Sequence, residues 1–368
     1  MALAGLALTT LAYHPPAISQ VEEIIVSARK IEENIQDVPV AVSAFTASTI
    51  QELNLESLDD IAKFTPGFSF TSAFGRQPGS DRPAIRGITT VVNGIANTSA
   101  VGYFVDGVYL GGSPQSTELF NLERVEVIKG PQAAQFGRGT YAGAINYVTR
   151  KPSMDGLEGG ITGTGAEHDT WEASGWLSGP LVENTLAFYV AAGYDTYGGE
   201  FDNQATGDEV GGTETTSATG KLLWTPVDGL EVTLKGGIQQ TEDDHFAIYL
   251  QGRSNNNCFP RTVDTPRSRE YYCGTARVDE NGINLATALL ENAEGGLSGV
   301  ELDRELASLT VSYTEPGGFN FMSTTGYVND EVETGYDVSY AFYDPVPVGA
   351  SAGSFYQLDE DESDVFTQ

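Results

Sequence analysis

Segments of about ten residues that alternate polar and apolar side chains fill the chain after Lys151 and Pro152. A period of two places the apolar side chains on one face of a strand, which is typical of the wall of a transmembrane β-barrel. No stretch reaches the roughly 18 uninterrupted apolar residues of a spanning helix, so strands are the expected membrane-crossing elements. Eight segments fit the pattern, at residues 157–167, 169–179, 184–195, 213–225, 230–242, 299–314, 319–332 and 357–368.

The connections between these segments are alternately short and long. Short turns on one side and long loops on the other are the asymmetry of an outer-membrane barrel. The connection at His168 and Asp169 is an exception, because it is short on the side where long loops are expected. The short turns lie at residues 179–184, 226–229 and 316–318, and the long polar loops lie at 196–212, 243–298 and 333–356.

Residues 37–152 have a different pattern, in which short strands alternate with short helices. This order predicts a compact α+β domain of ordinary size that precedes the wall. The helical signals are a capping box formed by Thr49 with Glu52 and an amphipathic stretch at 57–64. Strands are expected at 38–45, 84–88, 103–110, 123–129 and 143–150.

A domain of this length also sets the expected size of the barrel. Side chains fill the interior of an eight-stranded barrel, whereas a barrel of about 22 strands can hold a plug. The last residues, 362–368, fall inside a strand-like segment with no turn after them. We therefore expect residues 153–368 to form the N-terminal part of an antiparallel barrel that is incomplete in this chain.

The first 36 residues divide into two segments. Residues 1–19 include an apolar run from Met1 to Ala12 and are interpreted as a signal-peptide remnant, although no Lys or Arg precedes the run. In residues 20–36, three β-branched residues stand between charged flanks, at positions 24–26. This pattern predicts an exposed strand that awaits a partner, with a disordered N-terminus as the alternative.

Four segments, in order along the chain, resemble the TonB-dependent receptor family. The last and longest is the most specific, and together they cover a coupling segment and a plug domain. The family is found in the outer membrane of Gram-negative bacteria. The segments are EEIIVSARK at Glu22–Lys30, FTPGF at Phe64–Phe68 with RPAIRGI at Arg82–Ile88, GYFVDGVYLGG at Gly102–Gly112, and LERVEVIKGPQAAQFGRGTYAGAINYVTRKP at Leu122–Pro152.

The resemblance implies a mechanism and its partners. TonB, with its inner-membrane energising complex, would pair with the coupling segment and pull, so that the plug rearranges and a ligand passes. Strand addition suits this task because its hydrogen bonds come from the main chain. Outer-membrane lipid and a small-molecule ligand are the other implied partners. The TonB-interacting residues would be Glu22, Glu23, Ile24, Ile25, Val26, Ser27 and Ala28.

The ligand itself is not encoded in a recognisable motif. Ferric siderophore is the family default, and haem, cobalamin and oligosaccharide are alternatives. A surface-binding or adhesive β-protein without transport is the alternative from another class. The ligand-contacting residues are expected in the outer plug loops, at Phe74, Arg76, Gln77, Asn93 and Asn97.

Charged residues in or beside the plug strands are expected to hold the plug to the wall. A plug in a polar lumen can keep its place through charge-assisted hydrogen bonds, and the resemblance implies that plug arginines face acids of the barrel. Simple solvated charges are the alternative. The candidates are Arg86, Arg124, Glu126, Arg138 and Arg150.

The two cysteines, Cys258 and Cys273, lie in one polar loop. In an exported chain a pair so close predicts a loop-closing disulfide, and two free thiols are the alternative.

Several other classes of function find little support in the sequence. A formal charge of -32, from 51 acidic and 19 basic residues, leaves no broad basic surface for nucleic acid. No nucleophile elbow, phosphate loop or HExxH motif occurs, so neither an enzyme nor a cofactor is expected. His14, His168 and His245 are scattered, and the acidic run at 359–362 lacks the spacing of a calcium loop, so no metal site is expected.

Overall fold

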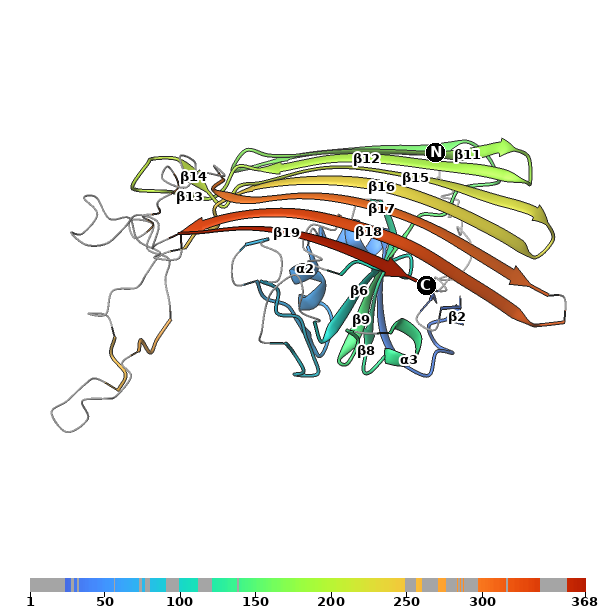
Figure 1. The fold of residues 1–368 in the computed structure, drawn as a ribbon, viewed down its shortest axis with the longest axis horizontal. Helices are drawn as coiled ribbons and strands as arrows, with labels where there is room; N and C mark the ends of the chain where they lie inside the picture. The colour runs from blue at the N-terminus through green and yellow to red at the C-terminus, as the bar shows by residue number, and fades with distance from the viewer. Residues whose placement is uncertain are drawn as a thin grey trace, which may run out of the picture.

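The computed structural model has two parts, a curved antiparallel sheet and a plug that packs against one face of it (Figure 1). No helix among the described residues is long and apolar enough to cross a membrane. The structure describes residues 24–27, 30–31, 33–55, 57–72, 75–76, 80–90, 99–111, 121–137, 139–248, 256–259, 271–275, 283, 285, 287, 297–315, 317–337 and 356–368.

The plug is built around a five-stranded sheet with the order β3-β8-β9-β6-β7. All pairs are antiparallel except β6 with β9, which are parallel. The central strands are almost continuously buried, because both faces of this sheet are covered, although β8 also carries charged residues. The strands are β3 (Ala41–Thr46), β6 (Val101–Val105), β7 (Val108–Tyr109), β8 (Leu122–Lys129) and β9 (Gly143–Thr149).

Short elements complete the plug. The predicted helix at 57–64 is α2 (Leu58–Lys63), which Ser57 and Asp60 open with a reciprocal capping box. The preceding helix begins earlier than expected, because its N-cap is Thr46 rather than Thr49. The remaining elements are β1 (Ile25–Val26), β2 (Glu33–Asn34), α1 (Ala47–Glu52), β4 (Phe68–Ser69), β5 (Ala84–Ile85) and α3 (Ala133–Phe136).

The wall is an eight-stranded sheet in which every strand pairs with the next wall strand along the chain. The alternating segments therefore predicted the fold class of this half correctly. A small hairpin, β13 (Phe201–Asp202) with β14 (Glu209–Val210), stands where only a loop was expected. The wall strands are β10 (Glu158–Ala166), β11 (Thr170–Val182), β12 (Leu186–Tyr197), β15 (Thr213–Val227), β16 (Leu230–Asp244), β17 (Gly299–Thr314), β18 (Asn320–Asp337) and β19 (Tyr356–Thr367).

The plug core extends onto the wall. Val328 of β18 and Val365 of β19 are buried in the same apolar cluster as the plug strands. Gly326 allows this approach, because a Cβ at that position would lie 2.5 Å from a methyl carbon of Val108. The backbone N–H of Tyr109 also donates to the hydroxyl of Thr367, at 3.2 Å. The plug and these two wall strands therefore share one packed interior.

We expect a fragment of residues 20–152 to be soluble and folded, because the plug has its own sheet and capped helices. Dispersed amide signals in an NMR spectrum would show this. Its stability should be lower than in the whole chain, since Val328 and Val365 are missing from its core. Broad, collapsed spectra with aggregation would contradict the boundary near residue 152.

Candidate functional site

The turn between β6 and β7 points a carboxylate of the plug at the wall. Asp106 and Gly107 have φ angles of 49° and 80°. Two consecutive positive φ angles are the geometry of a tight hairpin turn, which Asp-Gly favours. The turn therefore presents Asp106 at the edge of the plug, beside the wall strands.

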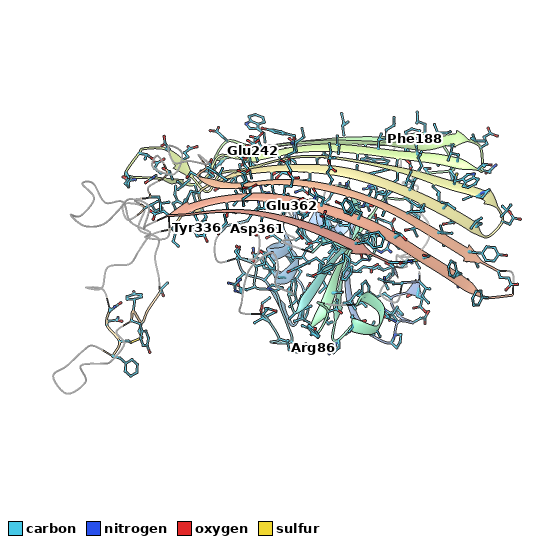
Figure 2. The ribbon with its side chains drawn as sticks, viewed as in Figure 1. Arg86, Phe188, Glu242, Tyr336, Asp361 and Glu362 are labelled. Carbon is cyan, nitrogen blue, oxygen red and sulfur yellow. A yellow bond between two sulfur atoms is a disulfide. The ribbon has the colours of Figure 1, made fainter. Side chains whose placement is uncertain are left out.

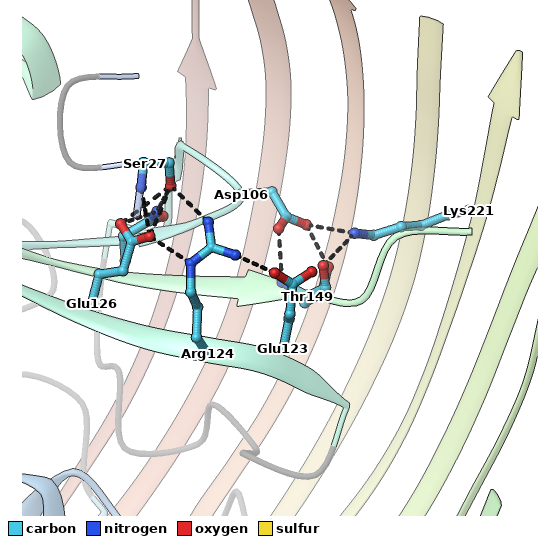
Figure 3. Close-up of polar contacts among 8 residues, drawn as sticks. Ser27, Asp106, Glu123, Arg124, Glu126, Thr149 and Lys221 are labelled. Atoms are coloured by element: carbon cyan, nitrogen blue, oxygen red, sulfur yellow. Dashed lines mark hydrogen bonds and ion pairs between the residues drawn. The ribbon is translucent and has the colours of Figure 1, made fainter. Parts of the chain in front are cut away.

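Asp106 binds two lysines from neighbouring wall strands. Its Oδ2 lies 2.8 Å from Nζ of Lys235 on β16 and 3.2 Å from Nζ of Lys221 on β15. Thr149, at the end of β9, donates its N–H to Oδ1 at 2.9 Å and its hydroxyl to Oδ2 at 2.6 Å. Lys221 also donates to the carbonyl oxygen of Thr149 at 3.1 Å (Figure 3). We call this group the Asp106 contact.

The charge of Asp106 is well supported. Burial alone would raise the pKa of this carboxyl, but the ammonium groups of Lys221 and Lys235 and the Thr149 hydroxyl outweigh burial. The pKa of Asp106 therefore lies well below its ordinary value. The carboxylate stays ionised wherever the two lysines are charged.

A second polar group holds Ser27, in the predicted coupling segment, against the plug. The backbone N–H of Ser27 donates to Oε1 of Glu126 at 2.7 Å, and its hydroxyl lies 3.1 Å from the same oxygen. Arg124 donates from Nε to Glu126 at 2.8 Å, and Asn146 donates to the Ser27 hydroxyl at 3.3 Å (Figure 3). The Glu126 side chain is fully buried, so these donors replace the hydrogen bonds that water would otherwise supply.

The coupling segment differs from the expected free strand. Ile25 and Val26 of β1 pair with Asn34 and Glu33 of β2, so a short hairpin already occupies one edge of the strand. Val26 is fully buried in the plug core, whereas Ile25 is 38% exposed. The segment is docked here because its apolar side chains find the plug core. Glu22, Glu23 and Ala28 lie outside the described residues.

The proposed plug–wall residues are only partly placed at the wall. The side chains of Arg124 and Glu126 contact each other and Glu123, Asn146 and Ser27, all within the plug and the coupling segment. Arg124 and Glu126 neutralise each other on one strand, so neither needs a charged partner on the wall.

Arg150 does meet the wall, with its guanidinium 5.0 Å from the ring centre of Trp176 on β11. Arg86 has a left-handed backbone at φ 54°, and its side chain lies near Gly130 of the plug. Figure 2 shows Arg86 on the side of the plug away from the wall strands. Arg138 lies outside the described residues.

Of the expected ligand contacts, the structure describes Arg76 alone. Its Nε donates to Oδ2 of Asp243 at 2.8 Å, and its Nη2 donates to Oδ1 of the same carboxylate. Asp243 is the penultimate residue of β16, beside the loop that runs to β17. Arg76 therefore ties a plug loop to the wall near the long-loop end, at the opposite side from the docked Ser27. Phe74, Gln77, Asn93 and Asn97 lie outside the described residues.

The structure joins Cys258 to Cys273 in a disulfide. His245 is buried after the end of β16, where its Nε2 accepts a hydrogen bond from the backbone N–H of Asp337 at 2.9 Å. His168 lies in the turn between β10 and β11. Within the described part of the chain, no three His, Cys, Asp or Glu residues are placed to hold a metal ion.

The sequence analysis did not predict the role of Asp106. A signal was present, because Lys221 and Lys235 are the only basic residues in their two wall segments. Both fall on the face that carries few apolar side chains, where a charge needs a partner. The partner could not be chosen without the fold, since 115 residues separate Asp106 from Lys221.

Comparison with known proteins agrees with this architecture. The TonB-dependent receptor plug domain family matches residues 34–144. The probable TonB-dependent receptor BfrD of Bordetella pertussis is 37% identical over 123 residues, which are 33% of this chain and 15% of that protein. Residues 34–144 therefore form a plug domain of the TonB-dependent receptor family. The location of the protein is the outer membrane of a Gram-negative bacterium.

Other relatives extend the match into the wall. The vitamin B12 transporter BtuB of Vibrio vulnificus is 28% identical over 214 residues, 56% of this chain and 33% of BtuB. The crystal structure of the ferric yersiniabactin uptake receptor FyuA from Yersinia pestis has a TM-score of 0.63 at 21% identity, and the match covers 81% of this chain and 42% of FyuA. The chain spans less than half the length of these proteins.

We expect Asp106→Asn to weaken the seating of the plug by about 3 kcal/mol, because two buried lysines lose their counter-charge. A urea titration followed by the fluorescence of Trp176, which touches Arg150 of the plug, would measure the change. A carboxyl whose pKa is lowered by folding stabilises the fold fully at pH values above its ordinary pKa of about 3.9. This contribution is lost as the pH falls through the lowered pKa. The Asp106 contribution should therefore be constant from about pH 5 to pH 7. The exposed Asp155→Asn is the matched control, and equal midpoints for the two variants would contradict the assignment.

We also expect Glu126→Gln to loosen the docked coupling segment, because a hydrogen bond to a charged acceptor is stronger than one to an amide by about 1 kcal/mol. Amide hydrogen exchange at Ser27 should accelerate roughly fivefold. Glu123→Gln is the control, since Glu123 binds Arg124 but not Ser27. Unchanged exchange at Ser27 in Glu126→Gln would show that the hairpin, rather than the carboxylate, holds the segment.

Proposed function

We propose that this protein imports a scarce small ligand across the outer membrane by TonB-dependent transport, with the plug as the gate. It acts as a transporter rather than an enzyme. The observation that carries the proposal is the coupling segment docked through Ser27 on Glu126 of the plug. A segment that is held by a few hydrogen bonds, and that leaves Ile25 exposed, can be handed to a partner strand.

The two sides of the plug suit the two tasks. Arg76 and Asp243 lie near the long loops, where a ligand arrives from outside. The hairpin of β1 and β2 lies on the side of the plug nearer to the short turns, where TonB would act (Figure 1). In this proposal, residues 22–28 are the TonB-interacting segment, and Phe74, Arg76, Gln77, Asn93 and Asn97 contact the ligand.

A ferric siderophore is the ligand we favour. The probable siderophore receptor PiuA of Acinetobacter baumannii is 31% identical over 126 residues, and FyuA takes up ferric yersiniabactin. Cobalamin is the second candidate, because BtuB matches a larger share of this chain. Growth of a receptor-deletion strain that expresses this protein would separate them. Rescue under iron limitation by a siderophore supports the first, and rescue under cobalamin limitation supports the second.

We expect Ile25→Pro, made in the full-length protein, to abolish uptake and to leave ligand binding intact. Proline removes a backbone donor and fixes φ, which prevents strand addition, whereas the ligand surface lies on the far side of the plug. Uptake of labelled ligand, compared with binding to intact cells, measures both.

Ile25→Val is the matched control and should retain both activities, because a β-branched side chain suits a strand and the main chain makes the bonds. Normal uptake by the proline variant would remove the coupling role from this segment. Loss of binding in the same variant would instead indicate that the fold is damaged.

A further inference from the structure

The face of the wall that points away from the plug can be identified from the Asp106 contact. Lys221, Lys235 and Asp243 reach the plug, so the odd-numbered positions of β15 and β16 face inward there and the even-numbered positions face outward. Residues directly opposite on paired strands point to the same face. We call such a set of opposite residues a row, and each row can be followed from strand to strand through the register.

The outward face divides into an apolar part and an acidic part. Near the short turns it carries large apolar side chains, including Phe188, Leu222, Leu234 and Leu309. Figure 2 shows Phe188 towards the short turns and Glu242 towards the long loops. Over the described length of β15–β19, the outward positions carry no Lys or Arg. The exposed outward acids are Glu214, Glu242, Asp244, Glu301, Asp303, Glu305, Glu331, Glu333, Glu360, Glu362 and Asp364.

The limit between the two parts does not follow a row. One row runs through Trp171, Thr196, Glu214, Glu242, Glu301, Glu333 and Glu360, and it serves as the reference. On β11 the apolar part reaches this row at Trp171. On β19 it ends at Phe366, which is six residues short of Glu360 (366 − 360). The last apolar outward residues are Trp171, Tyr194, Ala218, Ile238, Ala307, Tyr327 and Phe366.

The slope of this limit matches the tilt of strands in a membrane. Six residues at about 3.4 Å amount to roughly 20 Å along the strands, and six strand spacings of about 4.8 Å amount to roughly 29 Å across them. The ratio gives an angle of about 35°, and strands of outer-membrane barrels tilt by about 35–45°. A row is then inclined to the membrane plane by the same angle, whereas the limit of the apolar part runs parallel to that plane.

The side chains at the limit and the height of the apolar part also fit lipid. Trp171, Tyr194, Tyr327 and Phe366 stand at the limit and are 63%, 40%, 42% and 69% exposed. Aromatic residues at this level form the girdle of a membrane barrel. On β11 the apolar part spans ten residue steps, from Leu181 to Trp171, which is about 33 Å along the strand and about 27 Å along the membrane normal at this tilt. The apolar band of such barrels is about 25 Å tall.

We infer that the outer edge of the lipid hydrocarbon crosses the wall obliquely, along Trp171, Tyr194, Ala218, Ile238, Ala307, Tyr327 and Phe366. The occupant of the apolar face is the hydrocarbon of the outer membrane, and the outward carboxylates stand in the headgroup layer and the water above it. On β17–β19 the outward acids begin nearer to the short turns, because those strands leave the hydrocarbon sooner. The inference does not depend on which ligand is carried.

Ala192 and Glu305 test this inference, because they belong to one row and point outward, yet fall on opposite sides of the limit. Nitroxide labels on Ala192→Cys and Glu305→Cys would be studied in the intact protein in its membrane, with Leu309→Cys as the control on β17. The label at 192 should be severalfold more accessible to oxygen, and severalfold less accessible to a water-soluble nickel chelate, than the label at 305. The label at 309 should behave like the label at 192.

Three results would overturn the inference. Equal accessibilities at 192 and 305 would mean that the row lies level with the membrane. Access of the nickel chelate to 192 and 309 would place this face in water. Protection of 309 from both reagents would show that another protein, or a second copy of this chain, covers the face instead of lipid.

Discussion

The Asp106 contact is the interaction on which the arrangement of the two parts depends. Lys221 and Lys235 sit directly opposite each other on neighbouring strands, and both are almost fully buried. Two like charges in that position repel each other and lose their hydration, so the wall needs an anion at this point. Asp106 supplies it from the tip of a plug hairpin, and Thr149 fills the remaining acceptor sites. The wall therefore specifies where the plug must sit, and the contact is satisfied only when the two parts are together.

The same period-two geometry separates charge by sign across the wall. Lys221, Lys235 and Arg304 are the basic residues of β15–β19, and each meets a carboxylate, since Arg304 binds Asp330 through Nε at 2.6 Å. The outward positions of these strands carry acids without opposing bases. A chain with a formal charge of -32 can thus neutralise its few buried cations inside and leave its excess acids in water. Membrane insertion requires this separation, because an unpaired charge in hydrocarbon is costly.

Local patterns predicted the elements well, and the reason is that they depend on near neighbours. The alternation at 230–242 and 299–314 corresponds to β16 and β17, because side-chain direction in a strand is a property of adjacent residues. Partner choice is not local. Arg124 and Glu126 were expected to reach the wall, but they lie on one plug strand beside Ser27 and bind each other and the coupling segment. The hairpin at 201–210 was also missed, since two-residue strands leave no periodic signal.

The two polar groups differ in a way that bears on how a pulled plug would respond. Ser27 depends chiefly on one carboxylate, and its segment is paired over two residues with β2. The Asp106 contact combines two lysines and two bonds from Thr149, shielded by the wall, so several interactions must break together. The groups are linked, because Glu126 lies on β8, β8 pairs with β9, and β9 ends at Thr149. Force applied at β1 therefore meets the weaker attachment first. In the proposed transport, release of the coupling segment and displacement of the plug would then be separate steps, and the second would need strain that reaches β9 through the sheet.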